Sequence, residues 1–418
     1  MRKLSSTVLG LTAAMIMAPA TALELGNSSE LHGFVNQSYL YSPDNPYSGT
    51  ESLDGSFKFR ELGLNGFTEI SPEFRLAGQV ISRQRDETDD GNARIDFLLA
   101  DYLYYSDMDV TAGVRLGRVK NNVGFYNATR DIPSARPGFN VPDSIYFDSF
   151  RDSILSTDGI NLYGSLLFQD NQLNWELFAG RKSVESERVE YYLFGVPVGE
   201  GEFDEIALQG LNLNFVPAAH RGVKFGLSLL DASLDLDNPM SVTDAQMALF
   251  IAGPADVVAN PQNYVTGTRI DILFAILSAQ YSYDDWVITA EYMNLFTDLE
   301  LQVAGVSRNQ STTTEAYYLQ VEWLPTVSTS WFARYEELYL DKSNRSGGDM
   351  IASASNPHRG YGKGWSLGGK WMFYPRWTVT GQASFNEGSA WLPSYKGMEN
   401  DSIDKHWNYY VVSLTFQF

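Results

Sequence analysis

The last ten residues of the chain alternate between two kinds of side chain. Even positions carry Tyr410, Val412, Leu414, Phe416 and Phe418, whereas the odd positions become polar towards the end. The same period of two recurs over residues 365–373 and 377–386. This period is typical of β-strands whose two faces meet different surroundings. The three segments are therefore predicted to be consecutive strands with one apolar face each.

Similar segments precede them along the rest of the chain. They span residues 30–41, 55–68, 73–85, 94–107, 109–120, 157–169, 172–183, 205–216, 221–231, 270–283, 285–297, 314–324 and 327–340. An even number of strands lets both ends of the chain finish on the same side of a closed barrel. The pattern predicts an all-β fold, namely an antiparallel β-barrel of about 16 strands.

The connections between these segments alternate between short and long. Short ones fall at residues 70–72, 107–108, 170–171, 217–220, 284–285, 325–326 and 375–376, and long ones at 42–54, 86–93, 183–204, 232–269, 341–363 and 388–405. Tight turns at one end and long loops at the other are typical of transmembrane barrels, as are aromatic residues near strand ends. A soluble β-protein has the same alternation of residues but does not sort its loops in this way. We therefore expect a membrane-spanning barrel, whose sixteen strands leave an open lumen.

The N-terminus indicates where the chain is sent. Arg2 and Lys3 precede an apolar run over residues 8–17, and small residues follow at 20–22. This is the pattern of a secretory signal peptide, which we assign to residues 1–22; the alternative is a buried N-terminal helix. Residues 23–418 then form one barrel domain. No later apolar run approaches the ~18 residues of a membrane-spanning helix.

Charge and composition exclude several functions. The chain has no cysteine and a net charge of −21, which becomes more negative when Arg2 and Lys3 are removed. A partner such as nucleic acid is therefore not expected. The four histidines have no serine motif beside them, and no phosphate-binding or metalloprotease motif is present. We predict no enzymatic activity, no cofactor and no metal site.

One connection stands out because it is long and rich in aromatic and charged residues. Residues 121–156 lie between two predicted strands and contain three prolines. Ordered connections longer than about 12 to 15 residues are uncommon and usually functional. We therefore expect this segment to carry part of the function.

The sequence resembles the trimeric sixteen-stranded porins of Gram-negative outer membranes. The resemblance rests on the signal peptide, the strand count, the terminal Phe418, the long segment after the fifth strand, and Gly117-Arg118 followed by residues 123–127. It implies that the segment 121–156 is a third loop folded into the lumen as a constriction. It also implies a homotrimer in the outer membrane, and recognition of Phe418 by the barrel assembly machinery. The segment departs from the mainly acidic loop of general cation-favouring porins, because it mixes arginines with aspartates.

Charges at a narrow point of a channel decide which ions pass. Arginines on two strands, facing the charged loop, would produce a transverse electric field across the pore. On one of these strands Arg75, Arg83 and Arg85 share one face with Gln79. The alternative is that these residues bind lipid phosphates at the rim or pair within the loop. Arg118 and Lys120 share the alternation of Val114 and Leu116 unless a bulge near Gly117 resets it. The predicted constriction residues are Arg75, Arg83, Arg115, Arg118, Lys120, Arg130, Asp131, Arg136, Asp143 and Asp148.

Other charged residues are predicted to face the lumen, because a charge at the lipid midplane costs about 2 to 4 kcal/mol if basic. They are Glu176, Glu291, Glu322, Arg334, Glu336 and Lys370. Outside the barrel we expect contact with outer-membrane lipid and lipopolysaccharide. Residues 243–251 are expected to form a short helix packed on the barrel mouth.

The predicted function is passive diffusion of small hydrophilic solutes and ions through a water-filled channel. Two alternatives stay open. One is a substrate-selective channel for an anion or a sugar, and the other is a plugged barrel that serves as a surface receptor or adhesin.

Overall fold

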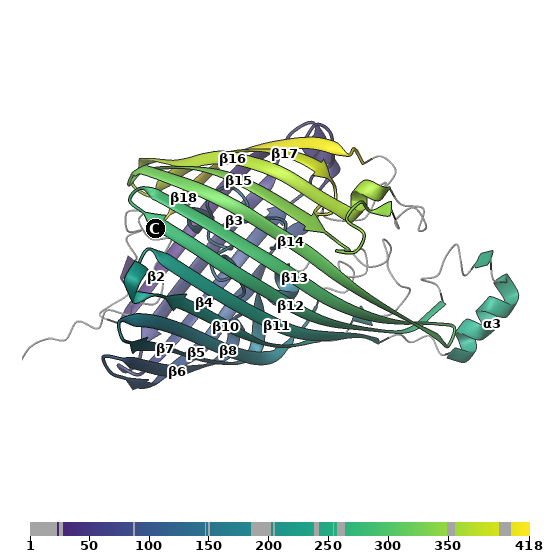
Figure 1. Ribbon diagram of the computed structural model, residues 1–418, viewed down its shortest axis with the longest axis horizontal. Helices are drawn as coiled ribbons and strands as arrows, with labels where there is room; N and C mark the ends of the chain where they lie inside the picture. Colours follow the sequence, from purple (N-terminus) through teal and green to yellow (C-terminus); the bar gives the residue numbers. More distant parts are fainter. Residues whose placement is uncertain are drawn as a thin grey trace, which may run out of the picture.

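The computed structural model describes residues 23–24, 28–86, 88–146, 148, 151–184, 202–203, 205–237, 242–253, 255–256, 264–348, 356–392 and 403–418. The proposed signal peptide, residues 1–22, lies outside the described residues. Sixteen long strands make up most of the fold (Figure 1). They are β2 (Ser29–Tyr41), β3 (Ser56–Glu69), β4 (Phe74–Arg85), β5 (Asp89–Ser106), β6 (Val110–Lys120), β7 (Ser156–Phe168), β8 (Asn171–Lys182), β10 (Ile206–Val216), β11 (Val223–Asp237), β12 (Val265–Tyr283), β13 (Trp286–Val303), β14 (Val306–Thr326), β15 (Thr329–Tyr339), β16 (Tyr361–Tyr374), β17 (Trp377–Gly388) and β18 (His406–Gln417).

Each long strand pairs antiparallel with its neighbours in the chain, and β18 pairs with β2 to close the barrel. Two-residue strands, β1 (Leu23–Glu24) and β9 (Glu202–Phe203), are added at the edges. The closed sixteen-stranded antiparallel barrel predicted from the sequence is confirmed. Figure 1 shows the short turns and the C-terminus at one end of the barrel and the longer connections at the other.

Helices are few and short in the described part of the chain. They are α1 (Arg151–Ile154), α3 (Val242–Ala252), and the 3-10 turns η1 (Thr50–Leu53), η2 (Pro133–Ala135), η3 (Ala218–His220) and η6 (Pro357–Gly360). None of the helices within these residues is both long and apolar enough to cross a membrane.

The outer face of the barrel carries an apolar belt. On β18, Val412 is 57 % exposed whereas its neighbour Ser413 is 3 % exposed and hydrogen-bonds inside the barrel to Ser38 and Asn36. Exposed Leu, Val, Ile and aromatic residues recur at outward positions of the other strands, with tryptophans near the short-turn end. This arrangement, apolar outside and polar inside, is the one that a bilayer requires.

Strands β11 to β14 extend further than the sequence pattern predicts. Residues 298–313 were expected in a loop, but β13 and β14 continue to a tight turn at Ala304 and Gly305, both with positive φ. Residues 232–237 and 265–269 of the predicted loop 232–269 likewise belong to β11 and β12. Above the apolar belt the outer face of these strands is polar and the inner face is apolar. Asp231 and Asp271 point outward, while Leu234 and Ile270 are buried inside. A search for an outward apolar face could not detect strands of this kind.

The predicted helix over 243–251 is present as α3, but not at the barrel mouth. It lies beyond the barrel, at the far end of the extended strands (Figure 1). Val242 of this helix contacts Gly305 in the β13–β14 turn, while Phe250 and Ile251 are exposed. The prediction of packing on the mouth was wrong, because the strands beneath the helix are longer than expected.

Candidate functional site

The connection between β6 and β7 crosses the inside of the barrel. Its backbone N–H groups donate hydrogen bonds to inward side chains of distant strands: Gly124 to Ser228 of β11 (2.9 Å), Phe125 to Glu291 of β13 (2.8 Å), Ser144 to Glu336 of β15 (2.9 Å) and Phe139 to Gln382 of β17 (2.8 Å). These strands face β6 from across the barrel. We call the described residues of 121–155 the interior loop.

The two ends of the interior loop are held together by Asn121. Its backbone N–H donates to the Leu155 carbonyl (3.0 Å), and its side-chain amide donates to the Ile154 carbonyl (2.9 Å) and to Thr157 Oγ1 (2.7 Å). The loop therefore leaves and returns to the wall at one point. A long segment can be ordered here because its polar groups find partners inside the barrel.

Gly124 lets the loop approach the wall closely. It has a φ of +63°, and a Cβ at this position would lie 2.2 Å from Tyr146 Oη and 3.0 Å from Glu291 Oε1. Any other residue would be strained and would also clash. The sequence placed this glycine at the start of the loop without indicating its role.

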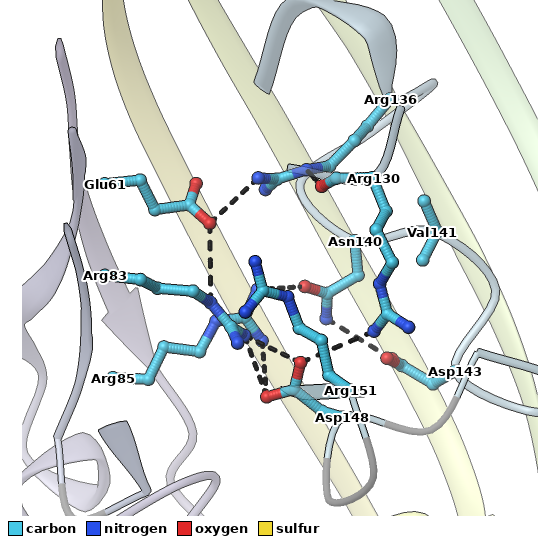
Figure 2. A pocket seen from close by; sticks show the side chains of 10 residues that line it. All are labelled: Glu61, Arg83, Arg85, Arg130, Arg136, Asn140, Val141, Asp143, Asp148 and Arg151. Atoms are coloured by element: carbon cyan, nitrogen blue, oxygen red, sulfur yellow. Dashed lines mark hydrogen bonds and ion pairs between the residues drawn. The ribbon is translucent and has the colours of Figure 1, made fainter. Parts of the chain in front are cut away.

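Arginines from the wall and from the loop surround a small cavity (Figure 2). Its charged lining consists of Glu61 of β3, Arg83 and Arg85 of β4, and Arg130, Arg136, Asp143, Asp148 and Arg151 of the loop. We call these eight residues the arginine cluster. The cavity measures about 20 Å³, enough for a single water-sized group. All five arginines are buried.

Asp148 and Glu61 hold most of these arginines. Asp148 accepts two hydrogen bonds from Arg83 Nη2, at 2.7 and 2.8 Å, and lies 3.6 Å from nitrogens of both Arg85 and Arg130. Glu61 accepts from Arg136 Nη2 at 2.8 Å and lies 3.5 Å from Arg83 Nε. The wall and the loop are thus joined by ion pairs that are shared among several cations.

The electrostatics of the loop residues favour a positive cluster. Burial alone would raise the pKa of the Asp148 carboxyl, but Arg83, Arg85 and Arg130 hold that pKa far below its ordinary value. Burial, together with the nearby Glu336 carboxylate, raises the pKa of Asp143 to about 7. Burial also lowers the pKa of Arg130 to about 10, so this guanidinium stays charged at neutral pH. Within the lining itself, five cations face two full negative charges and one partial charge; outside it, Asp89 lies 3.6 Å from Arg83, and Asp131 binds Arg151.

One donor in the cluster has no partner among the described residues. Arg130 Nη2 donates to the Tyr146 carbonyl at 3.0 Å, but Arg130 Nη1 is buried and unpaired. A buried donor without a partner costs about 1 to 3 kcal/mol. The cluster therefore has a free hydrogen-bond donor that water or a small anion would satisfy.

One carboxylate of the opposite wall, Glu291 of β13, gathers several of these contacts. Its oxygens accept from the Phe125 N–H (2.8 Å), Ser278 Oγ (2.6 Å), Tyr146 Oη (2.6 Å) and Tyr318 Oη (2.9 Å). Burial and the Glu291 charge raise the pKa of the Tyr146 hydroxyl well above its usual value, which keeps that hydroxyl a donor.

Four other predicted lumen residues also touch the interior loop or its partners. Lys370 Nζ donates to the Ser134 carbonyl at 2.8 Å, and Arg334 Nη1 to the Asn140 carbonyl at 3.3 Å. Arg334 Nε binds Glu336 at 3.0 Å, and Glu322 accepts from Gln320 at 2.9 Å. The wall from β14 to β16 therefore serves mainly to hold the loop.

Arg75, Arg115 and Glu176 form a second group, apart from the arginine cluster. Arg75 lies 2.9 Å and Arg115 3.5 Å from the shared carboxylate of Asp101, and Arg115 lies 3.9 Å from Glu176. Glu176 also accepts from Asn122 at 2.7 Å. These cations are more exposed than the arginine cluster, and Arg75 is in β4 nearer the short-turn end. They line the approach rather than the loop contact.

Arg118 is not brought to either group. It pairs with Asp158 through bonds of 2.7 Å, on the side of the sheet that carries exposed Leu98 and Leu116. The strand alternation therefore places Arg118 on the outer face, because Gly117 does not shift it inward. Lys120, two residues later, does reach inward, to Asp96 at 2.6 Å and to Asp131 at 2.5 Å. Asp131 in turn binds Arg151.

Three carboxylates of this network were missed from the sequence: Glu61, Asp89 and Asp96. Asp89 of β5 lies 3.6 Å from Arg83 and 2.8 Å from Arg94. Glu61 alternates with exposed Leu62, so the outward position of that leucine is a signal that would have placed Glu61 inside. Asp96 binds Gln79 at 2.8 Å as well as Lys120, but it lies where the β4–β5 register shifts, which hides its direction. Phe418 pairs through its backbone with Gly33 of β2, at 2.9 and 3.0 Å.

Among the residues that the structure describes, no group of three or more histidine, aspartate or glutamate side chains is arranged to hold a metal ion.

No protein family model and no curated protein sequence matches this chain. Solved structures do. The outer membrane channel DcaP of Acinetobacter baumannii is similar with a TM-score of 0.55 and 10 % identity, over 95 % of this chain and 99 % of that one. An anion-selective porin from Comamonas acidovorans is similar with a TM-score of 0.54 and 13 % identity, over 94 % of this chain and 99 % of that one.

A third structure is the trimer form of OmpT, an outer membrane protein of Vibrio cholerae. Its TM-score is 0.53 and its identity 11 %, over 94 % of this chain and 99 % of that one. Identities this low reflect a common fold rather than common residues in the site. The chain therefore shares its sixteen-stranded barrel fold with these solved structures.

Proposed function

We propose that the protein is an outer-membrane channel for the passive diffusion of small hydrophilic solutes, that the interior loop is its constriction, and that it favours anions. It would work as a homotrimer among outer-membrane lipid and lipopolysaccharide, after insertion by the barrel assembly machinery through Phe418. The trimer form of the similar Vibrio protein supports that assembly.

The observation that carries the anion preference is the arginine cluster. Five arginines and three carboxylates converge where the loop meets the wall, and the pKa of one of those carboxylates is raised. Cations held in a low-dielectric passage attract anions and repel other cations. The more exposed Arg75 and Arg115 extend this positive lining along the approach.

The dense packing of the interior loop limits the size of any solute. The cluster leaves a cavity of only about 20 Å³, and the loop is bound to strands around much of the barrel. This packing also favours the second candidate function, a barrel whose loop acts as a plug and whose outer surface binds a partner.

Reversal potentials in planar bilayers under a KCl gradient test the proposal. The unmodified protein should give stepwise currents with a reversal potential on the anion side. In the unmodified protein Arg85 Nη2 donates to Asn140 Oδ1 of the loop at 2.9 Å. Arg85→Gln removes this cation from the cluster and should lower the anion-to-cation permeability ratio severalfold. Arg118→Gln is the matched control on the outer face and should leave the ratio unchanged.

Two results would contradict the proposal. Absence of stepwise current from correctly folded protein would favour the plugged barrel. Equal permeability ratios in the unmodified protein and in Arg85→Gln would remove the cluster from the ion pathway.

A further inference from the structure

A second group of charged residues faces outward, on β13 to β17 and on the neighbouring residues 342, 345 and 405. It contains the cations Lys342, Arg345, Lys363 and Lys405, the carboxylates Glu315, Glu337 and Glu387, and the tyrosines Tyr292, Tyr317, Tyr335, Tyr339 and Tyr361. We call it the tyrosine–lysine patch. Its strand residues alternate with inward ones: Glu337 follows inward Glu336, and Lys363 shares the face of exposed Trp365.

The carboxylates of the patch hold its cations and tyrosines in place. Glu315 binds Arg345, Lys342 at 3.1 Å and Tyr292 Oη at 2.7 Å. Glu387 lies 3.0 Å from Lys405 Nζ and accepts from Tyr361 Oη at 3.3 Å.

Glu337 accepts from three phenol groups, Tyr317 at 2.5 Å, Tyr335 at 2.6 Å and also Tyr339. Its oxygens are therefore already occupied by donors within the protein.

The cations are anchored but still open to the outside. Lys342, Arg345 and Lys405 are 44, 50 and 46 % exposed in their side chains. Lys363 Nζ lies 5.8 Å from the ring centroids of Tyr339 and Tyr361, and Arg345 lies 4.8 Å over Tyr339. Within the described residues Lys363 has no carboxylate within 4.0 Å. Four cations thus face outward with three carboxylates, on a protein whose net charge is −21.

The patch lies near the top of the apolar belt. On β15, outward Tyr339 is eight residues above outward Trp331, which stands near the short turn. At ~3.4 Å per residue and the usual strand tilt this is roughly 20 Å of height, close to the upper edge of a belt ~25 Å tall. Below the patch, Trp365, Leu367 and Phe385 are exposed on the same face and suit acyl chains.

We propose that the tyrosine–lysine patch is a binding site for the phosphorylated disaccharide headgroup of lipopolysaccharide, lipid A. Lys342, Arg345, Lys363 and Lys405 would bind its phosphates, the tyrosine rings would pack on the sugar, and Trp365 and Phe385 would meet its acyl chains. Arg345 and Lys363, on either side of Tyr339, are the central pair. The site rests on the proposed location in the outer membrane but does not depend on conduction.

Binding of bisphosphorylated lipid A to the purified protein in neutral detergent, with EDTA present to remove bridging divalent ions, tests the site. Titration by microscale thermophoresis should show saturable binding that is lost with dephosphorylated lipid A. The double variant Arg345→Ala/Lys363→Ala should weaken binding by about 30-fold, because two cations at an anionic headgroup are lost.

The matched control is Arg181→Ala/Arg269→Ala, two outward cations near the same end of β8 and β12. It should bind lipid A like the unmodified protein. Conductance of every variant in planar bilayers shows whether its barrel is intact, and equal conductance is expected.

Three results would overturn the site: equal lipid A binding by both double variants, binding that ignores phosphate, or no saturable binding at all. Lipid A binding by a protein that passes no current would support the site while contradicting the proposed channel. The two proposals can therefore fail separately.

Discussion

Two of the places at which the wall holds the interior loop differ in their chemistry. On the side of β3 and β4, Glu61 and Asp148 bind four buried arginines, Arg83 and Arg85 from the wall and Arg130 and Arg136 from the loop, so each contact depends on the others. On the side of β13, the single carboxylate of Glu291 accepts four hydrogen bonds from neutral groups. The first side carries a surplus of charge, and the second carries almost none beyond Glu291 itself.

This difference separates two tasks that one loop performs. A shared ion network keeps a field at the constriction, because removing one member leaves the other charges buried there. A carboxylate saturated by neutral donors fixes position and adds little field that a solute would meet. We therefore expect changes at β13 to alter how wide the passage is, and changes at the arginine cluster to alter which ions use it.

The largest effect is expected from Glu291→Ala. Four donors lose their acceptor, two of them in the loop, so the free energy of unfolding should fall by about 3 to 5 kcal/mol and conductance should rise as the loop leaves the wall. Single-channel recording and thermal unfolding measure both. Glu300→Ala is the control, since Glu300 lies outward on the same strand and contacts Gln302 rather than the loop. Unchanged conductance in Glu291→Ala would mean that β13 does not position the loop.

Asp148→Asn should have a smaller effect on stability than Glu291→Ala. It should change the ion selectivity of the channel, whereas Glu291→Ala should change its conductance. It leaves Arg83, Arg85 and Arg130 without their shared anion, at a cost of about 3 kcal/mol, and should raise the anion-to-cation permeability ratio. Reversal potentials measure the ratio. Asp158→Asn removes the partner of outward Arg118 and should not change it. A ratio that moves equally in both variants would contradict the distinction between inner and outer charges.

The smallest effect is a pH dependence of the loop contact at Asp143. Burial and Glu336 raise the pKa of Asp143 to about 7, so between about pH 4 and 7 the folded protein holds a proton that the unfolded chain has released. Stability should therefore decline as pH rises through this window. Protonated Asp143 no longer repels Glu336, so channel openings should be fewer at pH 5.5 than at pH 8.

Asp143→Asn is the reference for this prediction, because it is neutral at every pH. Melting temperatures and open times of that variant should be flat from pH 5.5 to 8, apart from changes shared with the unmodified protein. A pH response of equal size in both proteins would assign the titration to another group.

Most of the barrel could be predicted from the sequence because a membrane-spanning strand follows one local rule, namely that every second residue faces lipid and is apolar. Residues 285–297 and 314–324 were recognised by outward apolar positions, but the observed strands β13 and β14 continue beyond the point where that rule stops applying. Above the belt the outward positions become Asp298 and Glu300, so β13 looked like a loop there. The local rule describes contact with lipid rather than strand formation.

The constriction residues were harder to predict, because their roles depend on contacts between distant parts of the chain. The arginines of β4 were found by alternation, and those of the loop by their density. Arg118 and Lys120 share one alternation, but only Lys120, the last residue of β6, reaches Asp131 of the loop, a contact that composition does not reveal. The partnership of Glu61 with Arg136 joins residues 75 positions apart and has no local signal.

Along β12 the outer face changes from apolar to polar, and this change marks the level of the bilayer surface on the barrel. Leu277 points into the lipid and Ile270 points inward under the loop, so between them the strand passes from the rules of a membrane protein to those of a water-soluble one. A probe attached at successive outward positions of this strand should change from an oily to an aqueous environment across that interval. The residue at which it changes would mark the level of that bilayer surface on the barrel.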